Sequence, residues 1–365
     1  MRCNYCLLIL LFATRPLHMA AQLPEYNQQI TKSFHIAAGV SVEISNKYGK
    51  VQVLPWEKDS VRFTIDMRIR AKDAQKLEKM KQNVEFDFIP GQYYIVARTT
   101  FGDGSSDVFK DLVDIAASYI SPSNSVSINY TVMVPAHATL KVENKFGDVY
   151  LEDHSGAVNL QLSYGDFKAN RLNGRTEMKL TSGDADVGYI KEGNITVSYG
   201  NVRIREASRL TMQSLSTVLT MEKLGTLKLN SRRDKVYLTE VNNISGESYF
   251  SVINLGTLNN EFTFSSRYGD IIVDEIRRSF SLVNITSELT DISLSFERPL
   301  VFGFELTHHQ AVTFVYPNSL AKLLTKVIIP EEKIFSTSGN FGTGADESRV
   351  ILKAMRKSSV TISQR

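Results

Sequence analysis

The stretch Phe146-Gly147-Asp148-Val149-Tyr150-Leu151 joins an aromatic residue, a glycine and a short acid to an alternation of apolar and polar residues. Alternating apolar residues are typical of a β-strand with one buried face, and a Gly-Asp pair is typical of a turn. The same pattern follows at Tyr164-Gly165-Asp166-Phe167-Lys168-Ala169. A corner followed by a strand is therefore the unit that this chain repeats.

Further copies of the unit occur on both sides of these two. They are Tyr48-Gly49-Lys50-Val51, Ser182-Gly183-Asp184-Ala185, Tyr199-Gly200-Asn201-Val202 and Tyr268-Gly269-Asp270-Ile271. In the middle of the chain the glycines lie at positions 147, 165, 183 and 200, a step of 17 or 18 residues. A fixed step with alternating apolar residues predicts an all-β fold, a single-stranded β-solenoid in which each coil covers the apolar side of the one before.

The corner residues are expected to align along one edge of this array. Glycine predicts a positive φ at each corner, and each aspartate is expected to bond to its own turn. The set comprises Tyr48, Gly49, Phe146, Gly147, Asp148, Tyr164, Gly165, Asp166, Gly183, Asp184, Tyr199, Gly200, Asn201, Tyr268, Gly269 and Asp270. Two interpretations exist for such a strip: a structural corner with stacked rings, or a binding site for sugar or calcium. The sequence lacks the glycine-rich nonapeptide of calcium-binding repeats, so a structural corner without metal or cofactor is favoured.

The first 21 residues have the pattern of a secretory signal peptide. Arg2 precedes an apolar stretch from Cys6 to Ala13, and small residues follow at Ala20 and Ala21. Cys3 and Cys6 are the only cysteines, so the exported chain is expected to hold no disulfide. No later apolar stretch is long enough to span a membrane. Removing two of the 42 basic residues leaves 40 beside 39 acidic ones, a balance that gives no long-range attraction for nucleic acid.

Residues 22–135 are expected to form β-coils interrupted by a helical insertion. Helical spacing of apolar residues predicts helices over 71–83 and 106–120, which we expect to cover the open N-terminal end of the array. The segment 42–49 is repeated in 140–147, and both copies end in Asn-Lys-aromatic-Gly. The two regions are therefore expected to begin with the same structural unit.

Residues 136–365 are expected to form the regular solenoid and the C-terminal strands. No proline occurs from Ala136 to Arg298, as uninterrupted sheet requires. The corner motif fades after Gly200, but the spacing of apolar residues continues. A turn-rich loop is predicted over 338–348, followed by two final strands over 350–355 and 360–362.

With these residues the chain resembles the "putative adhesin" family of exported bacterial β-strand-repeat proteins, also called auto-transporter-adhesin-like or head-domain proteins. The resemblance rests on Asn46-Lys47-Tyr48-Gly49-Lys50-Val51-Gln52-Val53, on the copy at 144–149 and on the later Tyr-Gly-Asp and Tyr-Gly-Asn corners. It covers roughly residues 35–365. The family implies a secreted or cell-envelope β-solenoid, with no catalytic residues to carry over.

One outward-facing row of residues deserves comparison with enzymes. Tyr150, Lys168, Asp186 and Arg203 occupy equivalent positions in successive units. Such a row is compatible with a groove like those of β-helical polysaccharide lyases, which need a base and a charge-stabilising group close together. A ladder of alternating charge is explained more simply by exposed cross-strand pairs, so no catalytic site is expected.

Two further motifs are expected to be structural. His308 and His309 are adjacent on a strand, so their side chains should point to opposite faces and not share a metal ion. Residues 338–344 look like a phosphate loop, but no Lys-Ser/Thr pair follows them, which excludes that motif.

These observations favour an exported, non-enzymatic β-solenoid that acts as an adhesin-like binding scaffold. The expected partner is an envelope protein or a glycan, and the expected location is the periplasm, the outer-membrane surface or the medium. Two alternatives remain: a polysaccharide-acting β-helix enzyme, and a structural or signalling envelope component that forms homo-oligomers through its open end.

Overall fold

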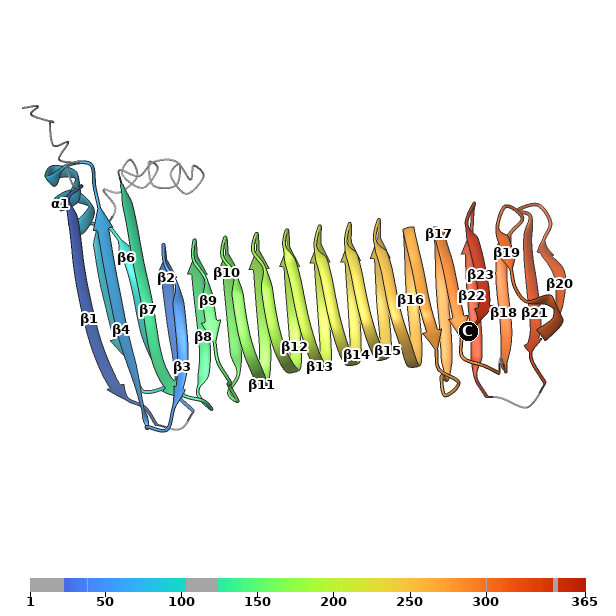
Figure 1. Ribbon diagram of the computed structural model, residues 1–365, viewed down its shortest axis with the longest axis horizontal. Coiled ribbons are helices and arrows are strands. Elements are labelled where there is room, and N and C mark those ends of the chain that lie inside the picture. Colours follow the sequence, from blue (N-terminus) through green and yellow to red (C-terminus); the bar gives the residue numbers. More distant parts are fainter. Residues whose placement is uncertain (1–22, 38, 103–123, 300, 344–346) are drawn as a thin grey trace, which may run out of the picture.

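The computed structural model describes residues 23–37, 39–102, 124–299, 301–343 and 347–365. Figure 1 shows strands side by side along one long axis, with β1 at one end and β20 and β21 at the other. Apart from one α-helix and one short 3-10 helix, every regular element of these ranges is a strand, which confirms the all-β prediction. The predicted signal peptide over 1–21 and the predicted helix over 106–120 lie outside the described residues.

The N-terminal part contains seven strands and the α-helix. Asp73 caps this helix, because its side chain accepts a hydrogen bond of 2.7 Å from the Lys76 N–H. The helix buries Met80 and contacts β1, β4 and β5, in agreement with the helix predicted over 71–83. In chain order the elements are β1 (Glu25–His35), β2 (Ser41–Lys47), β3 (Val51–Trp56), β4 (Ser60–Arg70), α1 (Ala74–Gln82), β5 (Val84–Pro90), β6 (Tyr94–Phe101) and β7 (Ser125–Pro135).

The middle of the chain forms a regular parallel array. Its strands are β8 (Thr139–Lys145), β9 (Val149–Leu151), β10 (Val158–Ser163), β11 (Phe167–Thr181), β12 (Ala185–Ser198), β13 (Asn201–Leu215), β14 (Val218–Arg232), β15 (Lys235–Tyr249), β16 (Val252–Ile276) and β17 (Leu282–Phe296). Ile195 pairs with Met212, and Met212 pairs with Leu229, so the pairing advances by 17 residues from strand to strand. This step persists where the corner motif fades, as the apolar spacing predicted.

Each repeat contributes to two sheets that meet at a corner. Segments that precede a corner, such as the one containing Met212, form what we call the pre-corner sheet. Segments that follow a corner, such as the one containing Leu219, form the post-corner sheet. The strands β11 to β15 each run through both sheets, with a bend between. Adjacent repeats therefore cover one another on both sheets.

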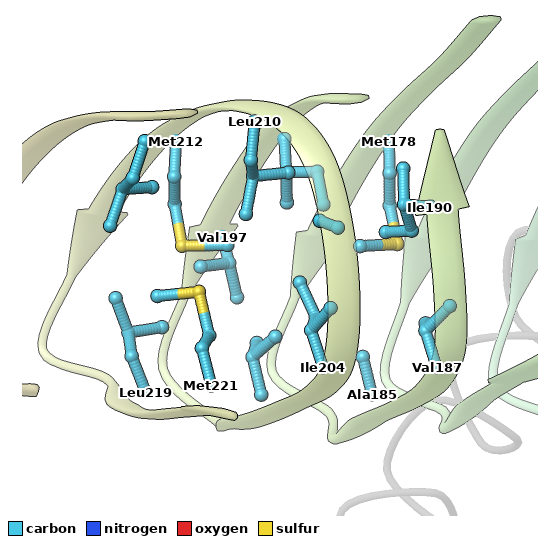
Figure 2. Packing of buried hydrophobic residues seen from close by; sticks show 14 of the residues in the cluster. Met178, Ala185, Val187, Ile190, Val197, Ile204, Leu210, Met212, Leu219 and Met221 are labelled. Carbon is cyan, nitrogen blue, oxygen red and sulfur yellow. The ribbon is translucent and has the colours of Figure 1, made fainter. Parts of the chain in front are cut away.

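The apolar residues of the two sheets face each other inside the array. Figure 2 shows Leu210 and Met212 of the pre-corner sheet opposite Leu219 and Met221 of the post-corner sheet. All four are almost completely buried. Full burial of such side chains contributes roughly 1.5–3 kcal/mol each. A single repeat buries few of them, so its stability depends on the neighbours above and below it.

The duplicated segments of the sequence are neighbours in space. Val42 pairs with Leu140 and Asn46 with Asn144, so β2 lies beside β8 in parallel register. On its other side β2 pairs with β6, while β3 pairs with both β7 and β9. The antiparallel strands β5, β4 and β1 complete this end, with β5 beside β6, β4 beside β7 and β1 beside β4.

The C-terminal strands do not follow one another in chain order. The elements are β18 (Phe302–His309), β19 (Thr313–Val315), the 3-10 helix η2 (Asn318–Leu320), β20 (Ala321–Ile329), β21 (Ile334–Phe341), β22 (Arg349–Met355) and β23 (Ser359–Gln364). The final strands β22 and β23 pair with β17 on one side and with β18 and β19 on the other. In chain order, the strands at the end of the array, β18 to β21, therefore come before β22 and β23, which lie between β17 and the end strands.

The two final strands agree with the sequence prediction. The loop predicted over 338–348 is wrong at its start, because β21 extends to Phe341. This segment pairs with β18 on one side and with β20 on the other, so its glycine and asparagine lie inside a strand and not in a loop.

Candidate functional site

A left-handed backbone marks the corner of every repeat in the array. The residues are Tyr48, Phe146, Tyr164, Ser182, Tyr199, Ser216, Arg233, Phe250, Tyr268, Leu289 and Arg356, with φ between 50° and 65°. The expectation that glycine carries the positive φ is therefore wrong, since the residue before the glycine carries it. A left-handed residue other than glycine costs roughly 1–2 kcal/mol, and here contacts between repeats offset that cost.

Glycine is needed at the next position for a different reason. A Cβ atom on Gly165 would lie 2.2 Å from the backbone oxygen of Gly147, and one on Gly200 would lie 1.9 Å from that of Gly183. Backbone atoms of successive repeats approach so closely at this corner that no side chain fits between them. Gly49, Gly147, Gly183 and Gly269 have contacts of the same kind.

The aromatic corner residues form two short stacks. The ring centroids of Tyr48 and Phe146 are 5.5 Å apart, and those of Phe146 and Tyr164 are 5.1 Å apart, with planes within 12° of parallel. Ser182 interrupts this stack before Tyr199, and the tyrosines on its two sides, Tyr164 and Tyr199, are 53% and 57% exposed. A second stack joins Phe250 to Tyr268 at 4.8 Å.

The corner aspartates link one repeat to the next. Asp148 Oδ1 accepts a hydrogen bond of 2.9 Å from the Asp166 N–H, and Asp166 Oδ1 accepts one of 3.0 Å from the Asp184 N–H. Asp184 Oδ1 in turn accepts 2.8 Å from the Asn201 N–H. Each aspartate was expected to bond to its own turn, and that expectation is wrong. These hydrogen bonds connect each corner to the next one and so stabilise the register between successive repeats.

Near the end of the array, Asp270 pairs in register with Asp291, whose Oδ1 accepts a hydrogen bond of 2.7 Å from the Ser359 N–H. The carboxylate link between corners is thus also used where the last repeat has been inserted out of chain order.

A second type of corner occurs where the glycine motif fades; the spacing of apolar residues in the sequence indicates a corner near Asp234 but not its chemistry. The Asp234 carboxylate, only 3% exposed, replaces the corner glycine and occupies the centre of a hydroxyl cluster. Its Oδ2 accepts from Ser214 Oγ at 2.6 Å, from Ser231 Oγ at 2.7 Å and from the Arg232 N–H at 2.9 Å. Its Oδ1 accepts from the Thr217 N–H at 2.7 Å. Four donors satisfy this buried charge, so the cluster stabilises the corner.

The serines of this cluster belong to a longer buried column two residues before the corners. Its members are Ser214, Ser231, Ser248, Ser266 and Ser287. Ser248 Oγ donates to Ser266 Oγ at 2.9 Å. The sequence signal is the 17- to 21-residue spacing of these serines, which begins after Gly200 and continues past the corner at Gly269.

A shallow groove crosses the outer face of the post-corner sheet. One hollow of about 530 Å³ includes Lys50, Gln52, Tyr150, Glu152, Lys168, Asn170, Asp186 and Arg205 in its lining. A second hollow of about 630 Å³ is lined by Asp153, Asn170, Arg171, Gly188, Arg205, Glu206, Glu222, Lys223, Thr239 and Glu240. The two hollows share Asn170 and Arg205 and together form what we call the post-corner groove.

Short side chains in neighbouring repeats create the hollow. The pairs Ala169–Val187 and Arg171–Tyr189 place Asn170 beside Gly188. A Cβ atom on Gly188 would lie 2.4 Å from the Asn170 backbone oxygen, so that position has no space for a side chain. Longer residues surround the two, and the guanidinium of Arg171 lies 4.3 Å from the centre of the Tyr189 ring.

Charged and polar groups of both signs line the groove. Arg205 Nη2 lies 3.2 Å from Asp186 Oδ1. Glu222 of the second hollow has its Oε1 2.9 Å from Nη2 of Arg203, a residue outside the groove lining. Tyr150 Oη donates a hydrogen bond of 2.9 Å to Asp148, and this bond is the main reason why the pKa of the Tyr150 phenol is raised. These exposed pairs contribute little to stability, but they fix donors and acceptors on the surface.

The predicted outward row is confirmed as a row of neighbours. Lys168 pairs in register with Tyr150 and with Asp186, and Asp186 pairs with Arg203. The ion pair of Asp186 is nevertheless made with Arg205, two residues further along the next strand. The ammonium group of Lys168 makes no hydrogen bond or ion pair with the described part of the chain.

The histidine pair lies away from this groove. His308 Nε2 is 3.1 Å from Thr337 Oγ1, whereas His309 Nδ1 accepts 3.0 Å from the Ala311 N–H. Burial lowers the pKa of His308. In the ranges that the structure describes, no group of three or more His, Cys, Asp and Glu residues is placed to hold a metal ion. Within the same ranges, no helix combines the length and the apolar character of a membrane span.

Comparisons with known proteins give the following. No family model and no curated protein matches the chain. A solved structure described as a putative cell adhesion protein from Clostridium sporogenes is 10% identical, with a TM-score of 0.21, and the match covers 93% of this chain and 100% of that one. A putative adhesin from Bacteroides fragilis is 9% identical, with a TM-score of 0.26 and coverage of 93% and 97%. A putative adhesin from Parabacteroides distasonis is 9% identical, with a TM-score of 0.25 and coverage of 73% and 92%. These descriptions agree with the family that the corner motifs resemble.

Proposed function

We propose that the chain is an exported, non-enzymatic β-solenoid and that its post-corner groove is the binding surface of an adhesin-like scaffold. In this proposal residues 1–21 are a signal peptide, residues 22–135 form N-terminal coils with a helical insertion, and residues 136–365 form the regular solenoid and its C-terminal strands. The expected ligand is an extended polar polymer, such as an envelope glycan.

The observation that carries this proposal is the groove itself. It is open, polar and several repeats long, whereas pockets for small molecules are enclosed and mostly apolar. Adjacent strands are about 4.8 Å apart, so donors and acceptors recur at that distance along the groove. A chain of sugar units with regularly spaced hydroxyls matches such a surface, because each repeat offers donors or acceptors at the same spacing, although the residue types differ.

Filling the groove provides the test. Asn170→Trp places a large ring in the centre of the groove, between the two hollows. Asn194→Trp is the matched control, because Asn194 is an exposed asparagine of the pre-corner sheet, paired with Glu177. Binding to a glycan array or to envelope polysaccharide should fall at least tenfold for Asn170→Trp and stay unchanged for Asn194→Trp. Equal binding by both variants and the wild type would place the ligand elsewhere.

A second candidate function is favoured by Lys168. This amine makes no ion pair among the described residues and lies between Tyr150 and Asp186, so a base and a proton donor are close together. A polysaccharide-acting enzyme uses such groups. Release of unsaturated or shortened products from polyuronides, abolished by Lys168→Met, would favour the enzyme. Binding without release would favour the scaffold.

A further inference from the structure

At each end of the array, one of the two sheets extends further than the other. At the C-terminal end, β22 and β23 are followed by β18 on the pre-corner sheet and β19 on the post-corner sheet. The pre-corner sheet then continues through β21 to β20, two strands beyond the level of β19. At the N-terminal end, β5 and β4 occupy the same level and β1 extends the post-corner sheet one strand further. The C-terminal end therefore protrudes on the pre-corner sheet, and the N-terminal end protrudes on the post-corner sheet. Figure 1 shows β20 and β1 at these two ends.

The C-terminal edge strand β20 exposes apolar side chains. Leu324 is 70% exposed, Val327 54% and Ile328 49%. The strand pairs with β21 alone among the described residues, so one side of its backbone has no ladder partner. Natural proteins usually protect such edges with charges, prolines or bulges. β20 has two such devices, its lysines and a register shift between Val327 and Ile329, but it still exposes more apolar surface than the largely polar edge strand β1 at the other end.

The N-terminal edge of the same sheet carries the opposite charge. β5 contains Glu85 and Asp87 and no basic residue, whereas β20 contains Lys322 and Lys326 and no acid. The β5 strand pairs only with β6 within the described ranges. Charges of opposite sign at the two edges of one sheet favour contact between the head of one copy and the tail of another.

We propose that β20 of one copy pairs with β5 of a second copy, so that the molecules associate head to tail along their long axis. Strand direction permits this arrangement. β20 runs parallel to β18 and thus to the repeats, while β5 runs antiparallel to β6 and thus against them. When two copies share one axis and one orientation, β20 and β5 meet as an antiparallel pair.

One register matches the two strands along the full length of β5. With Lys326 opposite Glu85, Leu324 lies opposite Asp87, and Asp87 is then diagonal to both lysines. Lys322 lies opposite Ile89 in the same register.

The other faces of the two strands match as well. Leu323 lies opposite Phe88, and Val327 lies opposite Val84. Leu323, Phe88 and Val84 already pack against the cores of their own molecules. The apolar interior of one copy would therefore continue into the next, while the charged pairs face outward.

The number of strands missing from the post-corner sheet at the contact distinguishes this arrangement from a tail-to-tail dimer. In the head-to-tail arrangement the two-strand recess beyond β19 receives the protruding β1, which leaves a gap of one strand (2 − 1). A tail-to-tail dimer joined through two β20 strands would leave a gap of four strands (2 + 2) in that sheet. The head-to-tail arrangement covers the apolar interior far better. Because the contact is heterologous, it leads to open chains of molecules.

The test uses the full chain and two charge reversals. Sedimentation velocity over a range of concentrations should show dimers and longer species for the wild type, visible as end-to-end rods by negative-stain electron microscopy. Lys326→Glu and Glu85→Lys should each weaken association roughly tenfold or more, because like charges then face each other. An equimolar mixture of the two variants should recover association, because each tail then meets a complementary head. Lys228→Glu, on an exposed lysine of the middle of the pre-corner sheet, should leave association unchanged.

Cysteine cross-linking identifies the partner strands. With Cys3 and Cys6 replaced by serine, the double variant Leu324→Cys with Asp87→Cys should form disulfide-linked multimers. Leu324→Cys alone should remain unlinked, since linkage there would mean a tail-to-tail dimer and overturn the proposal. A folded wild-type chain that stays monomeric at every concentration, or a mixture of charge variants that fails to recover, would overturn it as well. Glycan binding is measured separately, so failure here leaves the proposed groove function unaffected.

Discussion

The corner glycines provide the most direct test of how the repeats are held together. Gly165 follows the left-handed residue Tyr164, and its own φ is outside the left-handed region. The substitution Gly165→Ala therefore introduces no backbone strain of the left-handed kind. It does add a methyl group 2.2 Å from the Gly147 oxygen, about 1 Å inside van der Waals contact. The backbone of one repeat must move away from the other to accept it.

The expected loss of stability can be worked out from the contacts at that corner. Overpacking of a tight site costs typically about 1–3 kcal/mol. The movement also stretches the Asp166 N–H to Asp148 Oδ1 hydrogen bond of 2.9 Å, which contributes about 0.5–1.5 kcal/mol. Replacing glycine lowers the entropy of the unfolded chain and returns about 0.4–1 kcal/mol. We expect a net decrease in the free energy of unfolding of about 0.5–4 kcal/mol.

Urea denaturation followed by circular dichroism measures this decrease. Gly303→Ala is the matched control, because a Cβ atom there meets nothing closer than 3.8 Å and its φ is outside the left-handed region. The control should raise the free energy of unfolding by about 0.4–1 kcal/mol, because only the reduced entropy of the unfolded chain acts there. If Gly165→Ala proved as stable as Gly303→Ala, close backbone approach would not be the reason for the corner glycine.

Three further predictions follow from the corners and the buried groups. Asp234→Ala should lower the free energy of unfolding by about 3–5 kcal/mol, because four buried donors lose their acceptor. Asp184→Ala, which removes hydrogen bonds between exposed corners, should lower it by about 1 kcal/mol. Equal losses for the two variants in urea denaturation would contradict this. Ser216→Asn should raise the melting temperature slightly, since asparagine tolerates the left-handed φ of 53° better than serine does; a fall measured by calorimetry would argue against strain there. Burial lowers the pKa of His154 below its ordinary value of 6.5, so the neutral ring is favoured in the fold and its stabilisation is lost as the pH falls below 6.5. Acidification to pH 5 should therefore lower the melting temperature of the wild type more than that of His154→Gln, and equal slopes would exclude this histidine as the cause.

The sequence predicted the repeating part of the fold because one geometric requirement recurs there. Wherever the backbones of two repeats nearly touch, a glycine is required, so the step from Gly147 to Gly165 and Gly183 reports the step of the strands. The alternation of apolar residues continues it through β13 to β15, where the glycines are absent. Neither signal depends on what the protein binds, which is why both are easy to find.

The chemistry of the corners was less accessible. A glycine beside an aromatic residue leaves open which of the two adopts the left-handed backbone, and the answer depends on the neighbouring repeat. In the second kind of corner, the glycine position is occupied by Thr217, Asp234 or Ser251. These residues are buried beside the serine column. The glycine of the first kind of corner is absent from the second, so a search for the glycine consensus finds only the first.

The groove was partly predictable. The row from Tyr150 to Arg203 was identified from the register, because equivalent positions must be neighbours in a constant step. The hollow depends instead on Asn170 and Gly188, which are unremarkable in the sequence. Their importance appears only when they are placed side by side among the longer residues around them.

The two ends determine what the array can do as a whole. A stack with a constant step has no internal reason to stop, because every repeat presents the same edge to the next. This chain stops it by reversing strand direction, with β4 and β5 at one end and β21 at the other. Reversal alone leaves an edge that can still pair; β1 is polar along most of its length, whereas β20 combines two lysines with exposed apolar residues. Since this basic tail matches the acidic head in charge, direction and register, the same rules that stack the repeats within one molecule also favour the stacking of one molecule on another.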